Sequence, residues 1–128
     1  VPNSGIDLLL GAGAGPEATI AATAVKCLGG TMLVNVWKDK KDDPNRIDRL
    51  EVEGVDVEKT YTEDELAKGN QMVFAASGVT KGELLDGVRF YPNGAIVNSI
   101  SMRLPSGTFE KSETMLKFKG HPIYKQLT

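Results

Sequence analysis

The chain has 128 residues, of which 41% are hydrophobic and 25% are charged, and its formal net charge is -2. This size allows one hydrophobic core, so residues 1–128 are expected to form a single domain, and no apolar run approaches the roughly 18 residues that span a bilayer. Because the charge provides no basic field, neither nucleic acid nor a membrane is expected as a partner.

The first predicted elements surround a glycine-rich turn. Residues 6–10 are typical of a buried strand, residues 11–15 of a tight turn, and residues 16–28 of a helix that begins at Pro16 and stops before Gly29. Residues 31–36 predict a second buried strand, so the two strands should be parallel and joined by a right-handed crossover. The helix should pack on this sheet through an apolar stripe of Ile20, Ala21, Ala24, Val25 and Leu28.

The middle of the chain predicts shorter elements. Residues 37–43 are expected to form a solvated loop, and a mostly exposed helix should run from Pro44 to about Gly54. Thr62 and Glu65 have the spacing of a capping box for a short helix that stops at Gly69. Residues 72–76 predict another buried strand, which leads into a loop at residues 77–82, the kind of strand end where α/β sheets often place ligands.

In the last third of the chain, apolar residues recur at every second position, which is typical of a strand. Residues 105–107 predict a turn, residues 108–118 the returning arm of a hairpin, and residues 121–128 a peripheral extension. One face of the outgoing strand should carry Ile96, Ile100, Met102 and Leu104.

The glycine turn predicts an anion site. A glycine-rich turn lets backbone N–H groups approach a ligand, and the start of the following helix adds partial positive charge. Glu17 would repel a bound phosphate unless a cation lay between them, so phosphate together with a divalent metal satisfies all the charges. An ordinary helix-stabilising role for Glu17 is the alternative.

Two other phosphate-binding motifs fit less well. A Rossmann-like dinucleotide-binding unit would need glycine or alanine where Pro16 stands, and Glu17 would face its pyrophosphate. A Walker loop would need lysine followed by serine or threonine after the glycines, which this turn lacks.

Two separated motifs resemble one known family. The run Gly11 to Glu17, with the helix ending Lys-Cys-Leu-Gly-Gly, is similar to the metal-binding segment of class II fructose-1,6-bisphosphatases, bacterial enzymes of the lithium-sensitive sugar-phosphatase superfamily. Residues 74–90, followed by Ser-Met-Arg at 101–103 and Ser-Gly-Thr at 106–108, are similar to the same family in order and spacing. The resemblance extends from about residue 6 to residue 115.

The resemblance implies a fold and a set of site residues. It implies an α/β fold with three layers and a mixed sheet, corresponding to the C-terminal half of the sugar-phosphatase fold and ending in an antiparallel hairpin. It implies hydrolysis of the 1-phosphate of fructose 1,6-bisphosphate with Mg²⁺ or Mn²⁺, Glu17 as a metal ligand, and Gly13, Ala14 and Gly15 in the substrate-binding turn. The family usually has Gly-Gly-Ala-Pro-Glu-Gly, so the present turn places one extra methyl group near the ligand.

The same resemblance predicts an incomplete site. In the family, other acidic ligands lie in an N-terminal portion that this chain lacks, and one carboxylate cannot hold a hard cation alone. We therefore expect part of a longer phosphatase that is inactive by itself, completed by the missing portion or by another subunit, with homo-oligomers possible. A non-catalytic phosphate-binding or assembly module is the alternative. Cys27, the single cysteine, and the absence of a secretory signal favour the cytoplasm.

Overall fold

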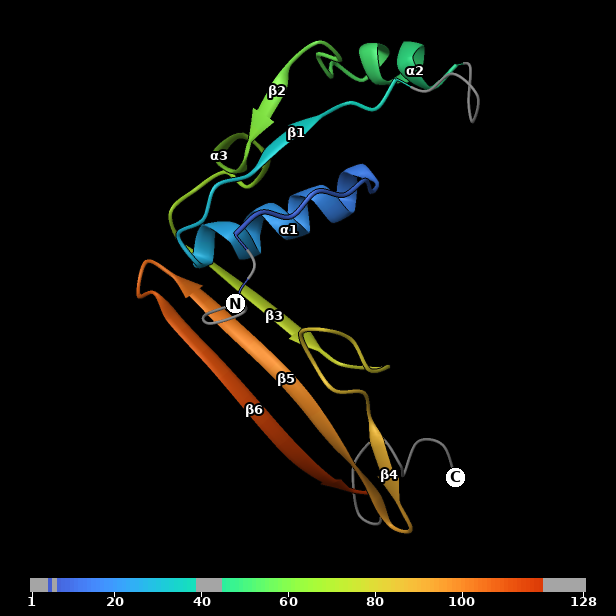
Figure 1. The fold of residues 1–128 in the computed structure, drawn as a ribbon, viewed down its shortest axis with the longest axis vertical. Helices are drawn as coiled ribbons and strands as arrows, with labels where there is room; N and C mark the ends of the chain where they lie inside the picture. Colours follow the sequence, from blue (N-terminus) through green and yellow to red (C-terminus); the bar gives the residue numbers. More distant parts are fainter. Residues whose placement is uncertain (1–4, 6, 39–44, 119–128) are drawn as a thin grey trace.

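A computed structural model describes residue 5, residues 7–38 and residues 45–118, and Figure 1 shows its elements. The chain contains both helices and strands, and its last two strands form an antiparallel hairpin. The predicted α/β class and the predicted hairpin are therefore confirmed. In chain order the elements are α1 (Gly15–Cys27), β1 (Leu33–Asn35), α2 (Arg46–Val52), β2 (Thr60–Thr62), α3 (Glu63–Leu66), β3 (Met72–Ser77), β4 (Arg89–Tyr91), β5 (Gly94–Leu104) and β6 (Thr108–Lys117).

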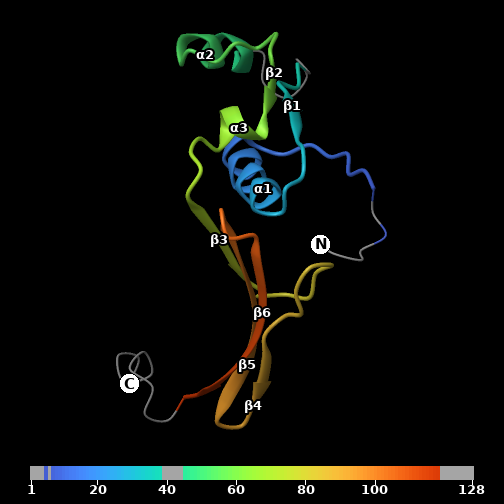
Figure 2. The ribbon, with the colours of Figure 1, turned by 90° about the vertical axis from the view of Figure 1, so that its left-hand side faces the viewer.

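Two separate sheets carry all the described strands. β1 and β2 form a short antiparallel ribbon, whereas β5 is the central strand of a four-stranded sheet. β6 lies along the whole of β5 on one side, while β3 and β4 share its other side. Helix α1 contacts α3 on one side and the strands β3 and β5 on the other, so it lies between the ribbon and the long sheet (Figures 1 and 2).

The predicted alternation in β5 builds the core. Ile100 and Met102 are each 2% exposed, and they pack with Cys27 of α1. β3 alternates in the same way, with Phe74 opposite Met102 on the covered face. Since successive side chains of a strand point to opposite faces, the period of two places one apolar face of the sheet against the helix.

The predicted parallel unit is wrong. Residues 7–10 belong to no strand, and Leu9 and Leu10 are each 84% exposed. β1 pairs with β2 and not with residues 7–10, and every pairing among the described strands is antiparallel. A buried parallel strand needs neighbours along its edges and cover on both faces, and this part of the chain supplies neither. Ile6 lies outside the described residues.

The second strand and the helix stripe also differ from expectation. β1 has only three residues, and Leu33 on it is exposed, so the expected long buried strand is wrong. Helix α1 spans the predicted residues to within one position, but Ile20 and Leu28 are exposed while Ala22 and Cys27 are buried. The helix turns a different face to the sheet because its partners are α3 and an antiparallel sheet rather than the expected parallel pair.

Several local predictions are confirmed. α2 has no buried residue, as expected of an exposed helix. Thr62 and Glu65 form the predicted capping box, and Glu65 Oε2 accepts from the Thr62 N–H at 3.0 Å. Of the predicted loop at residues 37–43, the structure describes Trp37 and Lys38 outside any element, and the remainder lies outside the described residues, as does the predicted extension at 121–128.

Lys26 ties α1 to the segment after α3. Its side chain is 8% exposed, and its ammonium donates to the carbonyls of Ala67 and Gly69 at 2.9 Å each and pairs with Asp64 at 2.8 Å. The three partners use the three N–H donors of a lysine, which is the condition for burying this group at acceptable cost. The contact fixes the C-terminal end of α1 where it meets the sheet.

The ion pair between Lys59 and Glu65 predicts a pH dependence of stability. The Lys59 ammonium, 2.5 Å from the carboxylate, and the Thr62 N–H lower the pKa of Glu65. A lowered pKa in the folded state means that the stabilisation is present above the unfolded pKa and is lost as the pH falls through the folded value. We expect Glu65→Gln to reduce the free energy of unfolding at pH 7 but not at pH 2. Urea titrations at the two pH values measure this, and an equal loss at both would contradict it.

Even α1, which with 13 residues is the longest helix of the described ranges, is too short to span a bilayer.

Candidate functional site

The glycine turn leads directly into α1, as the sequence predicts. Residues 11–14 have no regular structure and are exposed, and α1 begins at Gly15 with Pro16 in its first turn. No side chain caps this end of the helix. The N–H groups of Gly15 and Glu17 therefore remain available to an acceptor from outside the helix, where the helix dipole also favours negative charge.

The glycines of this turn are not required by contacts within the described chain. A Cβ at Gly11 or Gly15 would meet nothing within 4 Å, and one at Gly13 would lie 3.8 Å from the Cβ of Glu17, an ordinary contact. None of the three has the left-handed φ that favours glycine. The small size of these glycines would therefore matter only to a ligand or another segment that approaches the turn closely.

Glu17, the predicted metal ligand, is exposed in the first turn of α1. The described residues contain no group of three histidine, cysteine, aspartate or glutamate side chains that could hold a metal ion. Magnesium and manganese require several oxygen ligands, so Glu17 fits as one ligand but the described residues do not complete a site. The structure thus keeps Gly13, Ala14, Gly15 and Glu17 together, and the described residues do not gather the three side chains that a metal site would need around Glu17.

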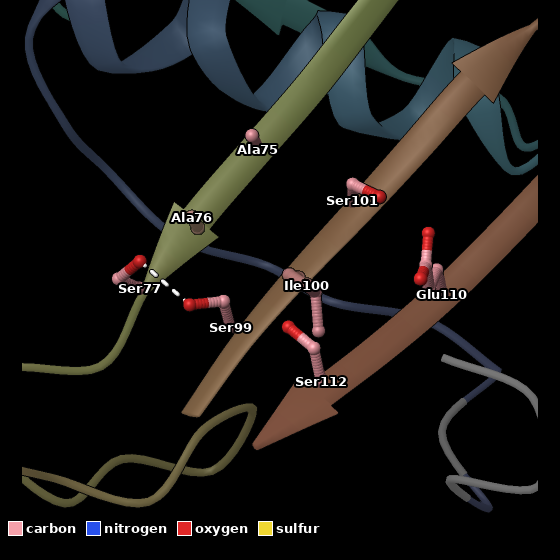
Figure 3. Close-up of a pocket in the computed structure, with 8 residues that line it drawn as sticks. All are labelled: Ala75, Ala76, Ser77, Ser99, Ile100, Ser101, Glu110 and Ser112. Atoms are coloured by element: carbon pink, nitrogen blue, oxygen red, sulfur yellow. Dashed lines mark hydrogen bonds between the residues drawn. The ribbon is translucent and has the colours of Figure 1, made fainter. Parts of the chain in front are cut away.

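A depression of about 330 Å³ lies elsewhere, on the uncovered face of the long sheet (Figure 3). Ser77 Oγ of β3 and Ser99 Oγ of β5 are 2.8 Å apart at one side of it, and Figure 3 shows Glu110 and Ser112 on β6 at the other. The eight lining residues are Ala75, Ala76, Ser77, Ser99, Ile100, Ser101, Glu110 and Ser112, none of which is basic or belongs to the predicted site.

The described lining of this depression is suited to hydrogen bonding. It contains hydroxyls and the carboxylate of Glu110 but no histidine, lysine or arginine, so among the described residues no cation lines it to attract phosphate. Ser77 begins the loop at residues 77–82 that the sequence marks as a possible ligand site, whereas no sequence motif points to Ser99, Ser101 or Ser112. The sequence does contain one indication of the serines of β5. In residues 99–102 serine alternates with Ile100 and Met102, so both serines lie on the face opposite the apolar one.

The loop between β3 and β4 is held by backbone contacts. Gly78 N–H donates to the Asn98 carbonyl at 2.9 Å, and Val88 N–H donates to the Val79 carbonyl at 3.1 Å. A Cβ at Gly87 would lie 2.8 Å from the backbone nitrogen of Lys81, so two stretches of the loop cross in close contact. Val79 at the start of the loop is nevertheless exposed. The loop therefore presents its outer side chains on a constrained backbone.

Comparisons with known proteins agree with the two motifs. A family model described as bacterial fructose-1,6-bisphosphatase, glpX-encoded, matches residues 1–116. Among curated proteins, the chain is 36% identical to one from Trichodesmium erythraeum over 88% of its own length, and 35% identical to one from Crocosphaera subtropica over 95%. A third, from Synechococcus elongatus, is 35% identical over 86% of the chain. All three are named D-fructose 1,6-bisphosphatase class 2/sedoheptulose 1,7-bisphosphatase.

The matched part of each relative is short. The chain spans 36%, 38% and 35% of the lengths of these three proteins, about a third in each case. The family match nevertheless covers most of the chain, including the glycine turn, the capping box and the long sheet except for the last residue of β6. The chain belongs to the family of bacterial, glpX-encoded fructose-1,6-bisphosphatases.

Proposed function

We propose that this chain contributes the glycine turn and Glu17 to the active site of a metal-dependent phosphatase that hydrolyses the 1-phosphate of fructose 1,6-bisphosphate. The observation that carries the proposal is the family match over residues 1–116, which includes the whole turn and helix α1. The uncapped start of α1 supports it, because free N–H groups at a helix N-terminus suit a phosphate oxygen.

In this proposal Glu17 supplies one oxygen ligand to Mg²⁺ or Mn²⁺, and backbone groups of Gly13, Ala14 and Gly15 bind substrate. When bound, such a metal polarises the phosphoryl group and lowers the pKa of a coordinated water. The remaining ligands have to come from outside the described residues. We propose that the N-terminal portion of a longer phosphatase chain, or another subunit, supplies them. The relatives are about three times as long as the part that matches, which leaves ample chain to supply them.

The direct test is release of inorganic phosphate from fructose 1,6-bisphosphate by the natural protein. We expect turnover with Mg²⁺ or Mn²⁺ and its loss in EDTA, and we expect residues 1–128 alone to show no enzyme-like rate. A natural protein that binds inorganic phosphate without hydrolysing the sugar bisphosphate would instead support a phosphate-binding module. Efficient turnover by the 128-residue chain alone would contradict the proposed division of the site.

A substitution in the turn separates a ligand-binding role from a structural one. Since a Cβ at Gly15 meets nothing within 4 Å, Gly15→Ala should leave the free energy of unfolding unchanged or raise it by up to about 1 kcal/mol. If the Gly15 N–H contacts phosphate closely, the added methyl group should lower kcat/KM by roughly tenfold or more. Phosphate-release kinetics and urea denaturation of the same preparation measure the two effects. Unchanged kinetics would remove this glycine from the proposed site.

A further inference from the structure

The outer edge of β6 is a ten-residue strand that has a partner on one side only. β5 pairs with it from Lys117 to Thr108, and no other described strand pairs with it. Figure 1 shows β6 at the outside of the four-stranded sheet, with its second edge bordered by no described strand. A long free edge is a template for another strand, and proteins either block such an edge or pair it.

The backbone register identifies which groups are free on this edge. The Phe118 N–H donates to the Asn93 carbonyl at 2.9 Å, directly continuing the β5–β6 register. Because hydrogen-bonded and non-hydrogen-bonded pairs alternate along an antiparallel ladder, the even-numbered residues of β6 turn their N–H and C=O groups toward β5. The groups left for the free edge belong to Phe109, Lys111, Glu113, Met115 and Lys117.

The side chains of this edge are self-complementary about Ser112. If a second copy of β6 lies antiparallel with Ser112 opposite Ser112, then Lys111 faces Glu113 and Glu113 faces Lys111 across the pair. In the same register Phe109 faces Met115, twice, and all four of these positions have their backbone groups free. Met115 is 64% exposed in the single chain, whereas Phe109 is half-buried against its own core, so the still exposed part of Phe109 is what a second copy's Met115 would contact.

Other registers that keep the hydrogen bonds are less favourable. The two nearest registers that keep the same hydrogen bonds are centred on residue 111 and on residue 113. The first places Lys111 opposite Lys111 of the second copy, and the other places Glu113 opposite Glu113. Like charges directly opposite each other destabilise a strand pair. The register centred on Ser112 therefore matches opposite charges where its two neighbours match like charges, so the edge specifies one pairing.

Glu113 already has one partner within the sheet. Arg89 of β4, on the far side of β5, reaches Glu113 Oε2 at 2.6 Å, so a lysine of a second chain would be a second cation for this carboxylate. Lys111 has no ion-pair partner within the described ranges and is exposed, so its charge is available to a second chain. Glu113 and Lys111 thus lie on one face of β6, with Glu113 paired to Arg89 and Lys111 without an ion pair among the described residues.

We propose that β6 is a homodimerisation edge, at which a second copy of this chain pairs antiparallel about a two-fold axis through Ser112 and extends the four-stranded sheet across both copies. This interface is independent of the phosphatase proposal, because it uses neither the glycine turn nor Glu17. Pairing of edge strands alone buries little surface, so the dimer should be weak and concentration-dependent unless further contacts accompany it.

A cysteine cross-link tests the position of the axis in the natural protein. In the proposed register the two Ser112 residues form a non-hydrogen-bonded pair, with Cα atoms about 4.5 Å apart, within the range for a disulfide. Ser112→Cys should therefore give a disulfide-linked dimer under mild oxidation. Thr114→Cys is the matched control, on the same face and equally exposed, but its two copies would be about 14 Å apart and should not cross-link. Native Cys27 is buried and contributes little background.

Charge reversal tests the pairing independently. Lys111→Glu puts two glutamates opposite each other at each pair and should raise the dissociation constant, measured by sedimentation, by roughly tenfold or more. Glu113→Lys should do the same, whereas an equimolar mixture of the two variants should form a heterodimer with every pair opposite in charge. A monomeric natural protein, equal cross-linking by Ser112→Cys and Thr114→Cys, or charge variants that dimerise normally would each overturn the proposal.

Discussion

Under the proposed function, replacing Glu17 by glutamine is expected to abolish most of the phosphatase activity of the natural protein while leaving its fold intact. The carboxylate is exposed and makes no ion pair among the described residues, so its removal leaves no buried group unsatisfied. The helix loses a favourable charge in its first turn, which costs about 0.3–1 kcal/mol of stability.

The expected loss of activity is much larger than this loss of stability. Groups that only orient metal ligands are worth about 10–100-fold in affinity or activity, so a direct ligand should be worth at least about 100-fold in kcat/KM. Calorimetric titration with Mn²⁺ should show weaker binding in Glu17→Gln. Glu51→Gln, which removes another exposed acid from a helix, is the matched control and should change neither kcat/KM nor the affinity for Mn²⁺. A Glu17→Gln variant with normal Mn²⁺ affinity and kinetics would leave this residue with a helix-stabilising role only.

The second large effect concerns the loop between β3 and β4. A Cβ at Gly78 would fall deep inside the van der Waals radius of the Asp86 carbonyl oxygen, and one at Gly87 would lie 2.8 Å from the Lys81 nitrogen and the Thr80 carbonyl carbon. These obstacles are backbone atoms, so no side-chain rotation can relieve them. We expect Gly78→Ala to lower the free energy of unfolding by about 3 kcal/mol, at the upper end of the range for overpacking.

Gly82→Ala is the control within the same loop. Its nearest atom to an added Cβ is the Leu85 carbonyl oxygen at 3.9 Å, so the change should stay within about 0.5 kcal/mol of zero. Urea denaturation of both variants measures the difference. Equal stability of Gly78→Ala and Gly82→Ala would mean that the crossing of the loop is looser than described. The result also bears on function, since a distorted loop would move the exposed Val79 and its neighbours.

Three exposed leucines near the start of the described chain differ most from what the sequence predicts. Leu8, Leu9 and Leu10 have the composition of a buried strand, yet they are exposed and unpaired in the described chain. Their pattern correctly indicates a preference for burial, but a preference does not supply the neighbouring strands that burial needs. Burial of these leucines would need strands or helices from outside the described residues.

The same distinction applies to the candidate site. The start of α1 after the glycines could be predicted because glycines, a proline and an acid follow one another in the sequence, whereas the role of Glu17 as a metal ligand stays a prediction. The serine depression could not be predicted as a unit, because Ser77, Ser99 and Ser112 come from three strands that are brought together only by pairing. Period-two alternation identifies one face of one strand and says nothing about which strand lies beside it.

The sequence by itself determined the elements whose signals are local. The capping box at Thr62 and Glu65, the hairpin turn at residues 105–107 and the apolar face of β5 each depend on residues close together in the chain, so each was predicted at its observed place. Only the tertiary structure decided that β1 pairs with β2, that α1 buries Ala22 and Cys27, and that β6 keeps a free, self-complementary edge. The physical reason is that strand pairing and helix packing depend on which distant surfaces are available, and no short-range pattern records that choice.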